Sequence, residues 1–193
     1  MQVMPETEIE VKSRAGLRGW LARNHATSGT VWLVIYKKHT DHYVPFGDLV
    51  SELLCWGWVD SVTRKVDDDR SACRISPRNP RSAWSAVNKA KVEEARAAGL
   101  MQPAGEAVIA RAQANGMWEF LDDVEAGIVP DDLAQALAEN GAKAGWQGYP
   151  PSVLRGTLEW IKTAKTPATR SKRIDDVVRH AGKGLRPSPF QTD

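Results

Sequence analysis

The periodicity of the apolar residues changes near Pro77, and this change limits the folds open to the chain. Before Pro77, the segments TVWLVIYKK, WVDSVTRKV and SACRISP are rich in β-branched and aromatic residues and bounded by turn residues, as strands are. Proline has no N–H group for a sheet ladder, so Pro77 and Pro80 end the last strand. After Ser82 the apolar residues recur at helical spacing. Strands that cluster before helices predict the α+β class and not a doubly wound sheet.

The expected architecture is a small antiparallel sheet with helices in the N-terminal part, followed by an all-helical C-terminal part. The polar turn DDDR separates WVDSVTRKV from SACRISP and predicts a hairpin, which pairs with TVWLVIYKK because a lone ribbon is marginal in water. We expect four regions: an α+β lobe (1–81), a helical hairpin packed on it (82–128), a C-terminal helical region (129–183) and a mobile tail (184–193).

Three hydroxyl residues precede helical patterns and are the expected N-caps. Ser13 precedes a helix with Leu17 and Leu21 on one face, and Ser82 precedes the first helix after the hairpin. Thr166 is followed by Pro167, and proline is favoured at the first helical position.

The cysteines and the apolar runs bear on location. Cys55 and Cys73 form neither a CxxC pair nor a disulfide framework, so we expect reduced thiols in a cytoplasmic protein. No run of about eighteen apolar residues occurs, and the acidic start MQVMPETEIEVK does not have the pattern of a signal peptide. We therefore expect no transmembrane segment.

The net charge of +2 is unevenly distributed along the chain. Residues 64–91 and 150–193 are mainly basic, and residues 93–142 between them are mainly acidic. One interpretation is solvated helix faces and attraction between the blocks. The other is a basic surface that meets an anionic partner.

No catalytic motif of a recognised class occurs, and isolated glycines such as Gly57 do not form a phosphate-binding loop. His39 and His42 flank Asp41 in KKHTDHY, but a stable metal site needs three or four ligands in fixed geometry. Residues 67–69 are three aspartates, which a turn between strands explains. We assign no catalytic residue and expect neither a metal nor a cofactor.

The segment SPRNPRSAWSAVNK is the best candidate for a binding site. It combines arginines with a helix start, an arrangement that suits a phosphate or carboxylate. The ligand-binding residues we propose are Asp60, Arg74, Arg78, Arg81, Trp84, Asn88 and Lys89, and a second basic patch comprises Lys165, Arg170 and Arg173.

This site has a functional and a structural interpretation. In the first, the guanidinium groups and the indole of Trp84 face outward and receive an anion. In the second, the arginines form ion pairs with Asp60 and with residues 67–69, and so tie the hairpin to the following helix. Asp60 pairs with Arg74 or Arg78 across the hairpin, or serves as a general acid or base beside Trp56.

The sequence also resembles a known family. The blocks CWGWVDS, DDDR, ISPRNPRSAWSAVNKAK, AAGLMQPAG, NGMW, VPDDLAQAL and LEWIKTAKTPATRSKRI resemble the bacterial YdeI/OmpD-associated family, also called bacteriocin-protection proteins. The resemblance covers about residues 10–183, and from about residue 129 it is to the helical domain after which the family is named. It implies a role in resistance to bacteriocins or antimicrobial peptides and an outer-membrane porin context, without a catalytic residue set.

The positions that carry the resemblance are Trp56, Gly57, Asp60, Pro77, Arg78, Arg81, Trp84, Asn88, Lys89, Trp160, Lys165, Thr169, Arg170 and Arg173. The chain departs from the expected pattern at Trp58, where an aliphatic residue is more usual, and at Trp146, where a smaller aromatic residue is expected. Both departures preserve bulk.

From the residues and the resemblance together we expect a non-enzymatic stress-protection protein that binds an anionic ligand or a protein partner. One alternative is an enzyme of unrecognised class with a pocket formed by Asp60, Arg78 and Arg81. The other is a nucleic-acid-binding module, because alternating arginine and tryptophan suits phosphates and bases. The sequence leaves the ligand and the oligomeric state open.

Overall fold

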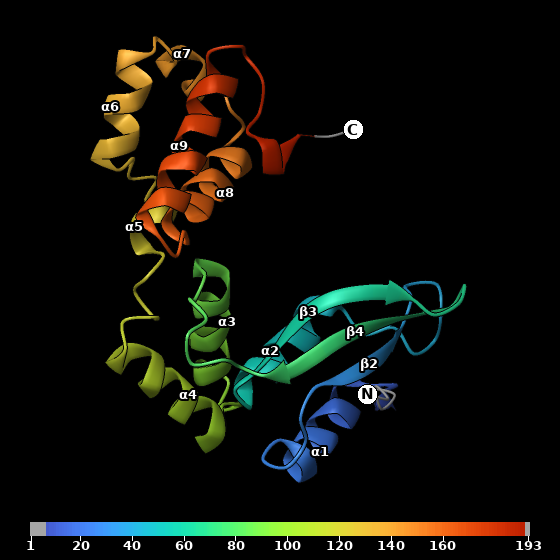
Figure 1. Ribbon diagram of the computed structural model, residues 1–193. Helices are drawn as coiled ribbons and strands as arrows, with labels where there is room; N and C mark the ends of the chain where they lie inside the picture. Colours follow the sequence, from blue (N-terminus) through green and yellow to red (C-terminus); the bar gives the residue numbers. More distant parts are fainter. Residues whose placement is uncertain (1–6, 192–193) are drawn as a thin grey trace, which may run out of the picture. The chain divides into compact units, whose positions relative to one another are not determined.

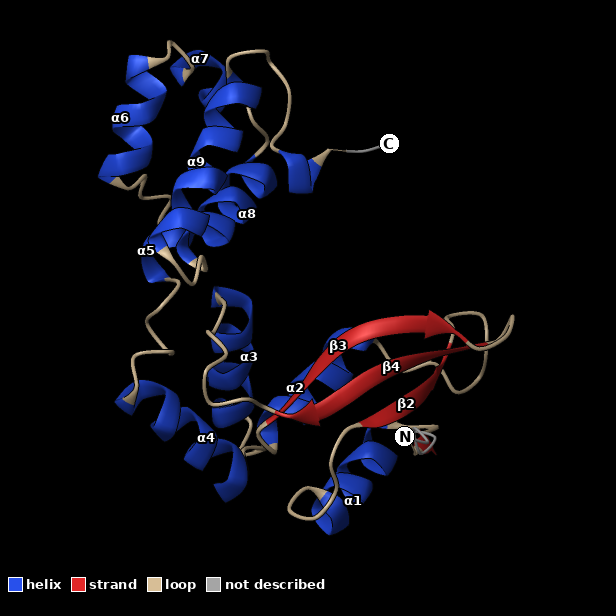
Figure 2. Ribbon diagram, viewed as in Figure 1, coloured by secondary structure: helices blue, strands red, loops and turns tan. Residues whose placement is uncertain are grey.

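The structure is a computed structural model that describes residues 7–191 of the chain. The chain divides into an N-terminal unit (1–120) and a C-terminal unit (121–193). The boundary therefore lies before residue 129, where we expected the C-terminal region to begin. Figure 2 shows that the strands belong to the N-terminal unit and that the C-terminal unit is built from helices, so the α+β class is confirmed.

The N-terminal unit contains a four-stranded sheet of order β1-β2-β4-β3. The strands are β1 (Glu8–Glu10), β2 (Val31–Tyr36), β3 (Trp58–Lys65) and β4 (Arg70–Pro77). The predicted β3–β4 hairpin and its pairing with β2 are both confirmed and antiparallel. In contrast, β1 runs parallel to β2, because the helix α1 (Arg14–Asn24) carries the chain back between them.

Two helices pack against one face of this sheet, α1 and α2 (Phe46–Cys55) (Figure 1). Their leucines meet alternate residues of the strands, which is why the strand pattern has a period of two. The buried core consists of Val11, Leu17, Leu21, Val31, Leu33, Leu49, Leu53, Trp58, Cys73 and Ile75. Ser13 caps α1 as expected, since its Oγ accepts a hydrogen bond from the N–H of Gly16.

The unit is completed by α3 (Ala86–Ala97) and α4 (Pro103–Ala114), which pack on α2. The predicted N-cap at Ser82 is wrong, because the Oγ of Ser85 caps α3 by accepting from the N–H of Asn88. The N–H of Trp84 instead donates to the carbonyl of Met117, which holds this part of the chain outside the helix. Trp84 therefore precedes α3.

The C-terminal unit consists of α5 (Asp122–Glu125), α6 (Asp131–Glu139), α7 (Lys143–Gln147), α8 (Pro151–Lys162), α9 (Pro167–Ala181) and the short 3-10 helix η1 (Ser188–Phe190). Each longer helix buries one apolar stripe. The buried residues of these stripes include Leu133, Leu137, Leu158, Ile161, Ile174 and Val177. The Oγ1 of Thr166 caps α9, as expected.

Residues 184–191 are attached to the helices, whereas we expected a mobile tail from residue 184. The hydroxyl of Tyr149 donates to the carbonyl of Leu185 at 2.6 Å. The carboxylate of Asp176 on α9 accepts from both the N–H of Ser188 (2.9 Å) and its Oγ (2.7 Å). These bonds fix η1 to α9 and the segment before it to Tyr149.

Replacing Asp176 by asparagine should release η1 at neutral pH. Although burial raises the pKa of Asp176, its hydrogen bonds to Ser188 and Arg179 outweigh burial and lower the pKa below the ordinary 3.8. The attachment is thus fully stabilised above the unfolded-state pKa and lost as the pH falls through the lower folded-state pKa. We expect the Ser188 amide to lose its protection from hydrogen exchange in Asp176→Asn at pH 7, and in the unmodified chain in acid.

Asp175→Asn is the matched control, because Asp175 is exposed on the same helix. Equal protection of the Ser188 amide in both variants at pH 7 would contradict this role of Asp176.

Candidate functional site

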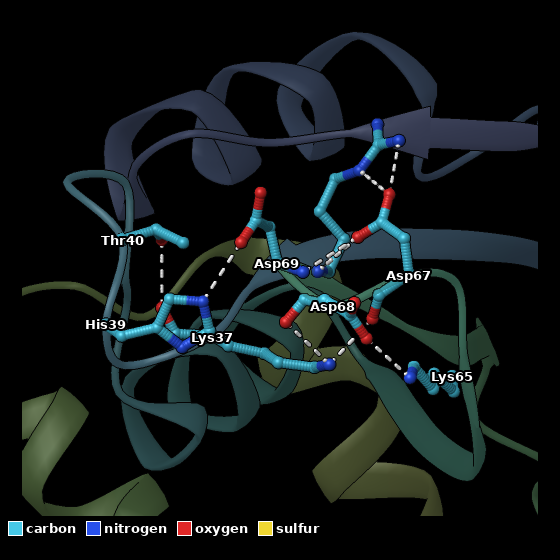
Figure 3. Close-up of polar contacts among 8 residues, drawn as sticks. Lys37, His39, Thr40, Lys65, Asp67, Asp68 and Asp69 are labelled. Atoms are coloured by element: carbon cyan, nitrogen blue, oxygen red, sulfur yellow. Dashed lines mark hydrogen bonds and ion pairs between the residues drawn. The ribbon is translucent and has the colours of Figure 1, made fainter.

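The three aspartates after β3 form a turn and make hydrogen bonds and ion pairs with neighbouring groups (Figure 3). The Nζ of Lys37 donates to the backbone carbonyls of Asp67 (2.6 Å) and Asp68 (2.9 Å). Asp67 accepts from the backbone N–H of Asp69 (3.0 Å) and from the guanidinium of Arg70 (2.7 Å), and the bond to Arg70 lowers the pKa of Asp67. These contacts close the β3–β4 turn. They explain why three aspartates occur here, and no bound ligand is needed to explain them.

Potential metal ligands do not gather in the described chain. His39 lies beside Asp69, with the Nε2 of the ring 3.0 Å from Oδ1 of the carboxylate. His42 packs edge-on against the ring of Tyr36 instead. Within residues 7–191, no three His, Cys, Asp or Glu side chains come together as a metal site.

Arg78 is the most unusual of the predicted site residues. Its side chain is buried, with 7% exposed, directly after β4. The guanidinium lies over the indole of Trp84, 4.0 Å from the ring centroid, and its Nη2 donates to the carbonyl of Ala83 at 2.5 Å. The Nε has no hydrogen-bond partner among the described residues. A buried guanidinium normally has a carboxylate beside it, and Arg78 does not.

Asp60 is the carboxylate that acts on Arg78 from a distance. Burial lowers the pKa of Arg78 to about 10, and the negative charge of Asp60 opposes this shift. Asp60 is half-buried on β3, opposite Ile75 of β4. The charge of Asp60 thus acts on Arg78, and the pairing of Asp60 with Arg74 or Arg78 across the hairpin stays a prediction.

Two tryptophans extend the Arg78 contact into a stack, which we call the cation–π stack. Trp84 and Trp118 lie with their ring centroids 5.0 Å apart, and the Nζ of Lys89 lies 5.4 Å from the centroid of Trp118. Its order is thus Arg78, Trp84, Trp118 and Lys89, and cations over indole faces are stabilising. Trp118 is not among the site residues predicted from the sequence. No local pattern indicated it because it follows α4, far from Arg78 in sequence.

The outward orientation that we expected is wrong for Trp84 and Arg78. Trp84 is only 1% exposed, because its indole belongs to the core formed by α2, α3 and α4. Arg81, by contrast, is exposed, and its backbone N–H donates a hydrogen bond to the Oδ1 of Asn79 at 2.9 Å. The site therefore has one buried and one exposed arginine.

The other predicted site residues lie apart from this pair. Asn88 is in the first turn of α3, where its N–H serves the helix cap. Arg74 is in β4 opposite Trp32, on the side of the sheet away from the leucine core. The structure thus brings Arg78 and Trp84 together and links Lys89 to them through Trp118, while Asp60 acts on Arg78 through its charge.

The second basic patch is divided among separate contacts. Arg170 binds Asp132 through two bonds, Nε to Oδ2 at 2.7 Å and Nη2 to Oδ1 at 2.9 Å. Arg173 donates to the carbonyl of Trp160 and lies over its ring, at the C-terminal end of α8 where cations are favoured. Lys165 is exposed. The three residues therefore do not form one open anion-binding surface.

The two cysteines are free thiols in the core. Burial raises the pKa of Cys55, and burial together with the charge of Asp60 raises that of Cys73 to about 11. The thiolate is the reactive form of cysteine, so these residues are unsuited to nucleophilic catalysis near neutral pH.

A cavity of about 400 Å³ in the C-terminal unit was not foreseen from the sequence. It is lined by Asp123, Val124, Ile128, Val129, Pro130, Asp131, Leu158, Ile161, Lys162 and Arg170. These residues come from separate elements whose faces meet only in the folded unit. Of the predicted basic patch, only Arg170 lines the cavity.

These features define a two-part chain, an α+β unit with a buried arginine and a helical unit with a cavity. Residues 9–108, more than half of the chain, match the family model for a domain of unknown function (DUF8412). Residues 126–184 match the family model described as bacteriocin-protection, YdeI or OmpD-associated. The chain therefore belongs to the family defined by the DUF8412 domain, and its C-terminal unit carries a match to the YdeI/OmpD-associated, bacteriocin-protection model.

Neither the curated proteins nor the solved structures with which the chain was compared contain a match. None of the helices described between residues 7 and 191 has the length and apolar character needed to cross a membrane.

Proposed function

We propose that this chain is a non-enzymatic protein that acts in resistance to bacteriocins or antimicrobial-peptide stress by binding an anionic group at Arg78. The protective role is supported by the family match over residues 126–184. We also propose a cytoplasmic location, which suits two free, buried thiols.

The observation that carries the binding proposal is the incomplete bonding of a buried cation. A buried donor without a partner costs roughly 1–3 kcal/mol, and more when the group is charged. In contrast, the buried carboxylate of Glu52 is bound by both Arg14 and Arg18. Arg78 has one carbonyl and one indole as neighbours, and its Nε is unused. An oxyanion accepting from Nε would satisfy this donor and supply the missing charge.

The position of Arg78 indicates how an anion would be received. The guanidinium is almost fully covered, and the neighbouring residues 79–81 are exposed and carry no core side chain. Binding would therefore involve a movement of this loop, which would bring the exposed Arg81 beside the anion. Two guanidinium groups on one short loop suit a phosphate or carboxylate.

The burial of Trp84 removes the main support for the nucleic-acid alternative. An indole that is 1% exposed offers no face on which a base can stack. The enzyme alternative depended on Asp60 and gains no nucleophile from Cys55 or Cys73, whose thiols are buried and protonated.

The N–H resonance of the Arg78 Nε should shift when inorganic phosphate is added, because an oxyanion would become its first hydrogen-bond partner. The measurement is an NMR titration of the arginine side chains in the full chain. The Arg96 Nε is the internal control, since it already donates to Glu106 at 2.9 Å and should not shift. Arg78→Lys should weaken phosphate binding by about tenfold, because lysine lacks the planar fork.

An unchanged Arg78 resonance at millimolar phosphate would refute anion binding at this site. The protective role is tested separately, by survival of a bacterial strain lacking the gene after exposure to a bacteriocin, with the intact chain or Arg78→Lys restored. Restoration of survival by neither chain would refute the protective role, and equal restoration by both would refute the part assigned to Arg78.

A further inference from the structure

The cavity of the C-terminal unit has an apolar floor. Val124, Leu158 and Ile161 are buried there, on α5 and α8. Ile128 and Val129, from the connection between α5 and α6, form a wall, and Ile128 is 59% exposed. Helices α5, α8 and α9 lie side by side in this unit (Figure 1). A volume of about 400 Å³ with this lining is within the range of small-ligand sites.

Arg170 provides donors at the edge of this apolar floor. Its guanidinium has five N–H groups, and the bonds to Asp132 and to the carbonyl of Ile161 use three of them. One N–H remains on each of Nη1 and Nη2. These two groups can donate to a ligand carboxylate while Nε and Nη2 stay bonded to Asp132. The bond to Asp132 also raises the pKa of Arg170, which is therefore fully charged.

Asp131 provides an acceptor at the same edge. It is exposed, lines the cavity, and makes no side-chain hydrogen bond or ion pair with the residues described between 7 and 191. It is the first residue of α6, at the N-terminal end of that helix. The remaining charges, Lys162 and Asp123, bind one another at 2.5 Å.

We propose that this cavity binds a free α-amino acid with a large apolar side chain. The carboxylate of the ligand would accept from the free N–H groups of Arg170, and its ammonium would donate to Asp131. Asp131 directly precedes Asp132, the partner of Arg170, and both Asp131 and Arg170 line the cavity. The side chain would lie on Val124, Leu158 and Ile161. This inference does not depend on the anion site at Arg78.

L-phenylalanine is the probe, and binding to the full chain is measured by NMR shifts of the Ile128 and Val129 amides. We compare it with L-phenylalaninamide, which lacks the carboxylate, and N-acetyl-L-phenylalanine, which lacks the ammonium. Each should bind at least about tenfold more weakly, since each loses a hydrogen bond between charged groups. Arg170→Lys should weaken L-phenylalanine binding by about tenfold, while Arg173→Lys, on the same helix outside the cavity, should leave it unchanged.

If Arg170→Lys does not fold, Asp131→Asn replaces it, because Asp131 touches no other described side chain through polar contacts. This variant should weaken L-phenylalanine by about tenfold and leave N-acetyl-L-phenylalanine unaffected. The proposal is overturned if L-phenylalanine shifts neither amide, if the three compounds bind equally, or if the cavity variants bind it as well as Arg173→Lys does.

Discussion

Replacing Gly145 by alanine should lower the free energy of unfolding of the C-terminal unit by about 3 kcal/mol. Gly145 lies where α7 crosses α9, and a Cβ placed on it would be 1.9 Å from the carbonyl oxygen of Ala181. Because the obstacle is helix backbone and not a flexible side chain, the two helices must separate. Hydrogen exchange of the α9 amides measures the effect, which corresponds to roughly 100-fold faster exchange through unfolding.

Gly148→Ala is the matched control in the same segment. A Cβ at Gly148 would meet its nearest neighbours, the carbonyl oxygens of Ala144 and Gly145, at 3.5 Å, an ordinary contact distance. We expect this change to lower the free energy of unfolding of the C-terminal unit by less than about 0.5 kcal/mol. If the two variants exchanged at the same rate, the close packing of α7 on α9 would be refuted.

Replacing Glu52 by glutamine should destabilise the N-terminal unit by about 3 kcal/mol. The carboxylate is 1% exposed and accepts from the Nε of Arg14 at 3.0 Å and the Nη1 of Arg18 at 2.6 Å. Glutamine keeps the shape but removes the charge, so two guanidinium groups lose their counter-ion at the junction of α1 and α2. Both arginines are about one-third exposed and can regain water, which places the cost at the low end for a buried pair. Denaturant unfolding of the full chain, followed by the tryptophan fluorescence of this unit, gives the value.

Glu93→Gln removes an exposed acid that also pairs with an arginine, Arg96. Surface pairs contribute at most about 1 kcal/mol, so this control should change stability little. A similar loss in both variants would show that the burial of Glu52 is not what makes it important.

Local pattern predicted the elements that depend on neighbours in sequence. The strands β2, β3 and β4 followed from β-branched and aromatic runs, and the caps at Ser13 and Thr166 from hydroxyl residues before helical periodicity. The prediction failed at Ser82 because a tertiary hydrogen bond, from Trp84 to Met117, keeps the chain extended for three more residues. By local chemistry alone, Ser82 and Ser85 are equally good N-caps for the helix that follows them.

The candidate site was predicted as a set of residue types but not as an arrangement. Arg78 and Trp84 do contact one another, yet they do so in the interior and not on the surface. Their burial depends on Trp118 and on α2, which lie far away in the sequence. Likewise, nothing local showed that Arg170 would reach the cavity while Arg173 would bind the end of α8.

The sequence by itself determined the order of strands and helices and the family, because periodicity, caps and motif blocks are properties of neighbouring residues. Only the tertiary structure decided which charges are neutralised, which indoles are buried and where a cavity remains. The reason is that desolvation and charge pairing depend on contacts between distant segments. Glu52 gained two arginine partners and Arg78 gained none, although both are buried charged residues in one unit.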